Sequence, residues 1–314
     1  MKSILIFADY FGQWPRWFGM YLESCRANPT VHWCIHTDCP EPEALPPNVT
    51  LIRMTFGDYC AHVSRKLGVR FFPQHPYSVC NLRPMFGIIH ADLIQGYDYF
   101  GWSDIDVIYG NIRSIYDDAV LSHNMISAHA YTCSGHLTLL KNEAWLKEAF
   151  LNIHCWRARL EDPAPCEWKH SLDEAHLTAM FAPTPHTRAD FSTMTGTFAP
   201  ETRYFTNNYF AEQWSTPFTP RPWLNGSRSH PDTWFWQNGR IQNIQDGDRT
   251  FLYLHLMNFK APCWIDENLY GRAPTWKQLD DCMKFDLAVL RMAPDNHRVR
   301  IDRQGMHLED ALAG

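Results

Sequence analysis

Three features are missing from the sequence, and each absence narrows the class of protein. No two of the 10 cysteines form a Cys-x-x-Cys pair, so neither a zinc ribbon nor a dithiol redox motif is indicated. No apolar run approaches the roughly 18 residues of a membrane-spanning helix. Basic residues are not in excess, because the formal net charge is −6, and this argues against nucleic acid as a partner.

The chain also lacks a recognisable secretion signal. Its first apolar run covers residues 4–7 and is cut off by Asp9, which makes it too short for the apolar part of a signal peptide. Scattered free thiols suit a reducing compartment. We therefore expect a cytoplasmic protein without a transmembrane segment, and peripheral contact with the inner membrane stays open as an alternative.

Aromatic side chains, by contrast, are abundant, with 13 Trp, 13 Tyr and 19 Phe in 314 residues. Such rings stack on sugars or bases, but they also pack long loops. Residues 183–235 combine many rings with weak periodicity, and we interpret them as long loops that form a lid or binding surface. In and next to this region lie four candidates for stacking on an acceptor sugar: Trp214, Trp223, Trp234 and Trp236.

The hydrophobic pattern alternates between strand and helix. A short apolar strand at residues 4–7 precedes a helical pattern that starts at Pro15, and strands follow at 31–35 and 49–54. This rhythm predicts an α/β fold whose ligands lie beyond the carboxyl ends of the strands, where Asp9, Asp38 and Asp104 fall. Further helices are expected at 58–67, 84–94, 143–156, 173–180 and 276–292, and further strands at 97–102, 125–128, 136–140, 240–244 and 250–256.

The Ser-Asp-Ile-Asp segment at 103–106 carries the clearest chemical signal. Asp104 and Asp106 lie two apart just after an aromatic strand, and paired carboxylates hold Mg²⁺ or Mn²⁺. An isolated Asp-x-Asp is as often a solvated turn. The aromatic strand before the pair and the Tyr109-Gly110 turn after it favour a shaped site.

Two later residues are candidates to complete that site. His255 lies in an apolar strand-like run, where a histidine is more often a core residue than a ligand. If this run ends near the Asp pair, the imidazole favours Mn²⁺ over Mg²⁺. Lys260 could then reach a leaving phosphate, and its alternative is an exposed loop lysine.

Three further charged residues have two interpretations each. Arg83 precedes Pro84 at a helix start, where a guanidinium clamps phosphate or sugar hydroxyls, or else forms a surface ion pair. Asp173 and Glu174 begin a short helix. Their spacing alone fits favourable charge at a helix N-terminus, although paired carboxylates also suit binding of sugar hydroxyls and stabilisation of an oxocarbenium-like centre.

Several linked segments resemble an uncharacterised bacterial family of predicted glycosyltransferases from surface-polysaccharide loci. That family is similar to retaining galactosyl- and glucosyltransferases of the glycogenin and lipopolysaccharide type, which share the GT-A fold. The resemblance covers roughly residues 3–265 and depends on the linked order of its pieces. Those pieces are residues 10–15, 24–29, 36–38, 80–84, 96–106 and 134–139.

This resemblance implies a role for each candidate at the metal and phosphates. Asp104 and Asp106 match the metal-binding pair, and His255 matches the histidine that completes the site. Lys260 resembles the lysine that binds the diphosphate, with a spacing from His255 that differs by one. Arg83 resembles an arginine that contacts donor phosphate and sugar.

The resemblance also assigns the two ends of the donor. Asp173 and Glu174 fall where related enzymes present an acid and an amide to the donor sugar, and the glutamate in place of the amide allows a nucleophile or base role. The nucleoside would face Asp38 and the segment Tyr10, Phe11 and Gly12. Asn81 stands where the related sequences have Asp.

The sequence therefore predicts one GT-A domain over residues 1–314, with a mixed sheet flanked by helices. Its nucleotide half would cover about 1–106, its acceptor half about 107–265, and a C-terminal helix and tail about 266–314. The expected activity uses Mn²⁺ or Mg²⁺ to move a hexose from a nucleotide-diphosphate sugar, by preference a UDP-sugar, to a glycan or lipid-linked glycan, with retention, in bacterial surface polysaccharide synthesis.

Two other functions compete with this prediction. A phosphohydrolase of the aspartyl-phosphate kind also has Asp-x-Asp after a strand, but there the pair is usually near the N-terminus and followed by Gly-Thr, whereas here Val107-Ile108 follow. A non-catalytic carbohydrate-binding protein would use the aromatic excess. It would not require Asp104, Asp106 and His255 to converge.

Overall fold

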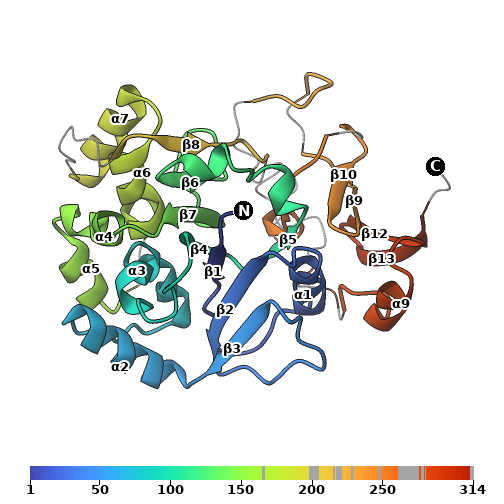
Figure 1. Cartoon of the computed structure of the whole chain (residues 1–314), viewed down its shortest axis with the longest axis horizontal. Coiled ribbons are helices and arrows are strands. Elements are labelled where there is room, and N and C mark those ends of the chain that lie inside the picture. The colour runs from blue at the N-terminus through green and yellow to red at the C-terminus, as the bar shows by residue number, and fades with distance from the viewer. Residues whose placement is uncertain are drawn as a thin grey trace.

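A seven-stranded mixed sheet forms the centre of the protein (Figure 1). The computed structural model describes residues 1–164, 167–197, 205–214, 216, 221–227, 230–246, 249–260, 276, 279 and 281–311. The strands run in the order β3-β2-β1-β4-β7-β6-β8. Their bounds are β1 Ile4–Phe7, β2 Val31–Thr37, β3 Val49–Arg53, β4 Tyr99–Ser103, β6 Met125–Ser127, β7 Leu137–Lys141 and β8 Asn208–Phe210.

The first four strands in chain order are mutually parallel. β1 pairs with β2 and β4 in parallel, and β2 pairs with β3 in parallel. β7 runs antiparallel to β4 and β6, while β8 is parallel to β6. The predicted α/β class with a mixed sheet is confirmed. Because parallel strands end at the same edge, the segments after β1, β2 and β4 meet there.

Helices cover both faces of the sheet because β1 is apolar on both sides. Leu5 and Phe7 pack into one core with residues of α2 and α3, and Ile4 and Ile6 pack into another with residues of α1. Successive side chains of a strand point to opposite faces, so four consecutive apolar residues require cover on each side. Figure 1 shows α1 apart from the group formed by α2 and α3.

The helical segments are short. No helix within the described ranges combines the length and apolar character needed to cross a membrane. The α-helices are α1 Phe18–Arg26, α2 Phe56–Leu67, α3 Phe86–Ile89, α4 Ala144–Lys147, α5 Trp156–Glu161, α6 Leu177–Phe181, α7 Pro185–Thr195, α8 Met257–Lys260 and α9 Leu287–Met292. The 3-10 and π segments are η1 Pro76–Met85, η2 Ile112–Ser114, η3 Val120–Ser122, η4 Ala149–Asn152, η5 Trp168–His170 and η6 Leu172–His176.

Two predicted helices differ from the structure in type or continuity. Of the segment expected at 84–94, residues 84–85 end the 3-10 helix η1, residues 86–89 form α3, and residues 90–94 form turns and a bend. α3 ends at His90, whose backbone is not helical and whose ring binds the carboxylate of Asp9. The helix expected at 143–156 is broken into α4, η4 and α5, and Ile153 between the last two has an extended backbone.

The interpretation of residues 183–235 as loops was wrong in part. This region contains α7, β8 and the start of β9 (Trp234–Gln237). α7 starts where the Thr184 side chain accepts a hydrogen bond from the N–H of Thr187, and it ends at Gly196 with φ of 70°. No residue of α7 is buried, so its sequence lacks an apolar stripe and the helix depends on its caps.

Within the described residues, the C-terminal region contains the short helix α9, which is the end of the helix expected at 276–292, and in place of a tail it contains two strands of a second sheet. Its four strands run in the order β10-β9-β12-β13, and the new bounds are β10 Arg240–Asn243, β12 His297–Asp302 and β13 Gly305–Asp310. The helix expected at 276–292 lies partly outside the described residues. Within 281–286 it is absent, because the N–H of Met306 bonds the carbonyl of Cys282 and the N–H of Lys284 bonds the carbonyl of Met306.

The aromatic residues proposed for acceptor stacking belong largely to this sheet's core. Trp234, Trp236 and Trp223 are exposed by only 1%, 3% and 4%, and Trp214 is partly buried against the same cluster. The stacking role assigned to them was therefore wrong. Alternate residues of β9 point inward, which places both of its tryptophans in the core.

A two-stranded ribbon connects the late part of the chain to the Asp-x-Asp segment. β5 (Val107–Tyr109) pairs antiparallel with β11 (Tyr253–His255), and His255 lies opposite Val107. The N–H of Leu256 donates to the carbonyl of Asp106 at 2.8 Å. A Cβ on Gly110 would lie 2.1 Å from the carbonyl oxygen of Phe251, so glycine is what lets the two segments approach.

The buried carboxylate of Asp9 connects the ends of β1 and β2 with α2 and with the end of α3. Asp9 accepts hydrogen bonds from Nδ1 and the N–H of His36, from the hydroxyl of Tyr59 and from Nε2 of His90. Burial opposes its charge, but the two histidines hold the pKa of Asp9 well below its usual range. Burial also lowers the pKa of His90 to about 4, with Asp9 opposing that shift in part.

We expect this network to weaken the protein in mild acid. His90 is neutral in the folded protein, and no described residue accepts from its buried Nδ1, so protonation favours the unfolded chain as the pH falls below about 6.5. Between pH 7 and pH 5 the histidine should remove about 2 kcal/mol from the free energy of unfolding. Urea unfolding of His90→Gln should show a correspondingly flatter pH dependence. The exposed His186→Gln should keep the wild-type slope, and an unchanged slope in His90→Gln would contradict the assignment.

Candidate functional site

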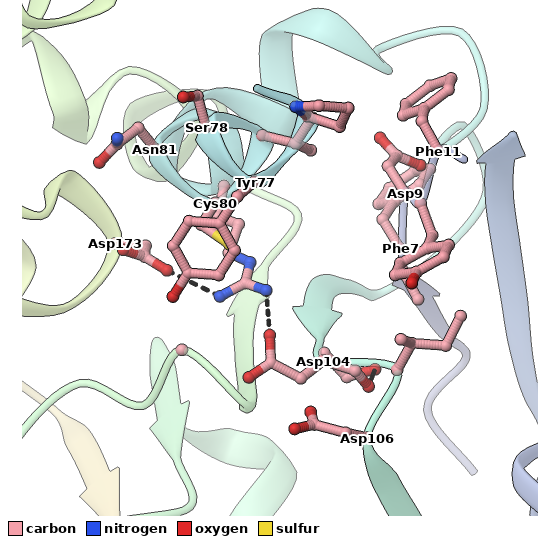
Figure 2. A pocket seen from close by; sticks show the side chains of 18 of the residues that line it. Phe7, Asp9, Phe11, Tyr77, Ser78, Cys80, Asn81, Asp104, Asp106 and Asp173 are labelled. Atoms are coloured by element: carbon pink, nitrogen blue, oxygen red, sulfur yellow. Dashed lines mark hydrogen bonds and ion pairs between the residues drawn. The ribbon is translucent and has the colours of Figure 1, made fainter. Parts of the chain in front are cut away.

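A cavity of about 880 Å³ opens at the edge of the main sheet where β1 and β4 end. Its walls come from segments far apart in the chain: the loop after β1, η1, the segment after β4, η6, and the end of β11 with α8. Figure 2 shows Asp104, Asp106 and Asp173 directed toward the same space. The cavity lies beyond the carboxyl ends of these strands, where ligands of α/β sheets bind.

Arg83 bridges two carboxylates inside this cavity. Its Nη1 donates to Asp173 Oδ2 at 2.8 Å, and its Nη2 is in contact with Asp104 Oδ1 (Figure 2). Burial disfavours the guanidinium charge, but Asp104, Cys80 and Asp173 together raise the pKa of Arg83 well above its usual range. Arg83 is thus a fixed positive charge between the two acids, and the alternative of a surface ion pair was wrong.

Asp106 is surrounded by a second set of basic groups. Lys260 Nζ is in contact with Asp106 Oδ2, and His255 Nε2 lies 3.4 Å from the same oxygen. Although burial opposes ionisation, these two side chains hold the pKa of Asp106 well below its usual range. Lys260 is therefore an ion-paired residue at the site and not a loop lysine, and His255 is both buried and beside the Asp pair.

Glu174 stands out because its protonation changes near neutral pH. Burial and the neighbouring Asp173 raise the pKa of Glu174 to about 7. Its Oε1 accepts a hydrogen bond from the N–H of Gly135 at 2.9 Å. A Cβ at Gly135 would lie 2.8 Å from that oxygen and 3.0 Å from Nη1 of Arg83, so this glycine keeps room for both side chains. Burial likewise raises the pKa of Asp173.

Of the residues expected to face the nucleoside, three line the cavity. Tyr10, Phe11 and Gly12 do so, whereas Asp38 is exposed and is not among the lining residues. Asp38 Oδ1 instead accepts a hydrogen bond from the N–H of Gly12 at 2.7 Å. Asp38 therefore holds in place the loop after β1, which lines the cavity with Tyr10, Phe11 and Gly12.

Other residues at or beside the cavity were given no role by the sequence. Tyr77 and Trp168 line it with exposed fractions of 74% and 52%, and they are the large exposed rings at its walls. Asn81, which stands where related sequences have Asp, accepts a hydrogen bond from the N–H of Leu172 and so caps η6. His136 lies beside His255, with ring centroids 4.6 Å apart.

The donors around Asp104 fit a divalent cation. One ligand atom each from Asp104, His136 and His255 lies within 4.8 Å of the others. Carboxylate oxygens combined with imidazole nitrogens form the type of donor set that transition ions accept. Burial, with His255 adding to it, places the pKa of His136 well below its usual value, so its ring is neutral at physiological pH.

Comparison with models of known protein families finds a match for this chain. The family model described as "Family of unknown function (DUF6625)" matches residues 6–271, which include every cavity residue discussed above. The chain belongs to this family. Among curated proteins, none matches the sequence.

Several solved structures show distant similarity to this chain. One is galactosyltransferase LgtC in complex with donor and acceptor sugar analogs, 11% identical, with 69% of this chain and 90% of that chain covered at a TM-score of 0.32. Glycosyltransferase GlyE of Streptococcus pneumoniae TIGR4 is 13% identical, with coverages of 53% and 41% and a TM-score of 0.30. Mouse xyloside xylosyltransferase 1 is 13% identical, with coverages of 52% and 75% and a TM-score of 0.30. The function is therefore inferred from the site itself.

Proposed function

We propose that this family member is a metal-dependent glycosyltransferase of the GT-A type. It would move a hexose from a nucleotide-diphosphate sugar, by preference a UDP-sugar, to a glycan or lipid-linked glycan acceptor, with retention, in bacterial surface polysaccharide synthesis. The observation that carries the proposal is the convergence of Asp104, Asp106 and His255 in one cavity. The side chains of Arg83, Lys260, Asp173 and Glu174 line the same cavity. Its volume of about 880 Å³ suits a ligand of nucleotide-sugar size.

The positive and negative groups divide the cavity into a phosphate region and a sugar region. Asp104, Asp106 and His255 would hold Mn²⁺ or Mg²⁺, which when bound neutralises charge on a diphosphate. Lys260 would bind a diphosphate oxygen once it releases Asp106, and Arg83 would contact donor phosphate and sugar with its planar fork. Tyr10, Phe11 and Gly12 form the wall assigned to the nucleoside.

Glycosyl transfer breaks the bond from the anomeric carbon to the diphosphate and forms one to an acceptor oxygen, whose proton must leave. We assign to Glu174 the role of nucleophile at the anomeric carbon, or of the base that accepts the acceptor's proton, because its carboxyl group titrates near neutral pH. Asp173 is bound to Arg83, which makes it a weaker nucleophile and a better positioning group. The exposed rings of Tyr77 and Trp168 are the surfaces on which an acceptor sugar would stack.

The position of Asp106 favours this function over an aspartyl-phosphate phosphohydrolase. Its carboxylate is neutralised by Lys260 and flanked by His255. A carboxylate in that environment is suited to bind a cation rather than to attack a phosphate.

The C-terminal sheet would belong to the same domain as the cavity, although a helix and tail had been expected at that end of the chain. Nε1 of Trp236 in β9 donates to the carbonyl of Tyr109 in β5 at 2.9 Å, and this bond is buried. Because β5 directly follows Asp106, the second sheet packs against the ribbon that carries the proposed metal site.

Binding of donor to the folded protein should raise its apparent stability. In a panel of nucleotide-diphosphate sugars tested with Mn²⁺, at least one should raise Tm by several degrees, since ligand at 100 times its Kd adds about 2.7 kcal/mol. The same compound should be hydrolysed or transferred slowly, and both effects should disappear with EDTA. If no member of the panel stabilises the protein or is consumed with Mn²⁺, Mg²⁺ or Co²⁺, the proposed function is wrong.

A further inference from the structure

Three ligand-type side chains from separate parts of the chain meet at one point of the cavity edge. Asp104 follows β4, His136 immediately precedes β7, and His255 ends β11. One ligand atom from each lies within 4.8 Å of the other two. Asp106 adjoins this group through His255, because its Oδ2 is 3.4 Å from His255 Nε2.

The backbone holds His136 in this place. β4 and β7 are antiparallel with Ser103 opposite Leu137, so the next residues along each strand, Asp104 and His136, are also opposite one another. The N–H of Asp104 donates to the carbonyl of His136 at 3.3 Å. The position of His136 is thus set by the register of the sheet, and its ring lies next to His255 at a centroid distance of 4.6 Å.

A second imidazole changes which ion the donors prefer. Mg²⁺ is bound mainly by oxygen and keeps much of its water, whereas first-row transition ions accept imidazole nitrogen readily. A set of two carboxylates and one histidine is compatible with both kinds of ion. Two histidine ligands would leave fewer positions for oxygen ligands and would therefore disfavour Mg²⁺.

We propose that His136 is a protein ligand of the metal, together with Asp104, Asp106 and His255, and that it makes the site select a transition ion such as Mn²⁺ or Co²⁺ over Mg²⁺. This inference rests on the metal site of the proposed function. It adds a residue to that site and strengthens the preference for a transition ion that the imidazole of His255 already favours.

The test measures metal binding directly in the full chain. Electron paramagnetic resonance of added Mn²⁺ gives its Kd, and competition gives the Kd of Mg²⁺. His136→Phe keeps a ring of similar size against Tyr253 and His255 but removes both nitrogens, and His136→Gln tests the position with a polar side chain. We expect both variants to bind Mn²⁺ at least ~10-fold more weakly, with a much smaller change for Mg²⁺. The matched control is His230→Phe, a buried histidine packed between Trp223 and Trp234 outside the cluster, and it should keep wild-type Mn²⁺ binding.

Counting the nitrogen ligands by spectroscopy shows whether His136 binds the metal itself or only stabilises the surrounding fold. Electron spin echo measurements on bound Mn²⁺ should detect two imidazole nitrogens in the wild type and one in His136→Phe. A single nitrogen in the wild type, or an unchanged preference for Mn²⁺ over Mg²⁺ in both folded variants, would overturn the proposal.

The test of His136 as a ligand and the test of the proposed function can fail independently of each other. Two nitrogens on Mn²⁺ without consumption of any nucleotide sugar would support the ligand assignment and refute the transferase. Nucleotide-sugar turnover with one nitrogen would support the transferase and refute the ligand assignment.

Discussion

Replacing Asp106 with Asn should reduce metal-dependent turnover of a nucleotide sugar by about 10³-fold or more. The substitution keeps the shape of the side chain but removes the charge that faces His255 and Lys260. With that charge gone, the cation loses a ligand and Lys260 loses its partner. The measurement is the rate of Mn²⁺-dependent hydrolysis or transfer, together with stabilisation of the variant by donor and Mn²⁺, which should also disappear.

The control for this variant is a carboxylate removed from the surface. Asp92 pairs with Lys66, and its side chain is 77% exposed, so Asp92→Asn changes the net charge equally and leaves the cavity untouched. It should retain wild-type turnover. If Asp106→Asn remains within about threefold of the wild type, the metal site lies elsewhere and the proposed mechanism fails.

The part of the fold that was predicted correctly is the part dominated by local pattern. The strands predicted at 4–7, 31–35 and 49–54 coincide, within two residues at one end, with β1, β2 and β3 of the main sheet. The Asp pair was identified because it directly follows such a strand. Here sequence proximity and spatial proximity coincide, so local chemistry was enough.

The errors arose where contacts between distant segments decide the structure. The C-terminal strand β12 was missed because its pairing with β9 spans some sixty residues of chain, and β13, which pairs with β12, was missed with it. Trp234 and Trp236 were assigned to solvent for the same reason. α7 was missed because it has no buried residue and therefore no apolar stripe. A polar helix of this kind is recognisable only by its caps.

At the site, too, local sequence identified some side chains, whereas the role of others depends on contacts between distant segments. His255 was named as a candidate from its place in an apolar run and was then matched by the resemblance, whereas His136 was overlooked although it lies in the recognised segment 134–139. Its significance depends on the register between β4 and β7, which sets His136 opposite Asp104. Asp9 was placed at a strand end correctly, but its burial under His36, Tyr59 and His90 needed the packed structure.

The sharpest remaining question at the site is which acid performs the chemistry, and pH dependence can answer it. The pKa of Glu174 is raised to about 7, chiefly by burial and next by Asp173, so its carboxylate form increases as pH rises from 6 to 8. If the carboxylate is the reacting form, kcat/KM for donor turnover should rise about tenfold per pH unit below 7 and level off above it. A rate that falls over this range would assign Glu174 as a proton donor instead.

Glu174→Gln should lower kcat/KM by about 10²- to 10⁴-fold and abolish the rise between pH 6 and pH 8. Because the pKa of Glu174 is raised from 4.5 to about 7, its ionisation removes stability as the pH rises from about 4.5 to 7, and the loss is complete above pH 7. The Gln variant avoids this loss and should be at least as stable as the wild type at pH 8. Unfolding therefore would not explain a loss of rate. The matched control is the exposed Glu167→Gln, seven residues earlier on the same segment, which should keep both the rate and its pH profile. Should Glu174→Gln retain the wild-type rise with pH, the reacting carboxylate is another group, and Asp173 becomes the residue to test next because burial raises its pKa as well.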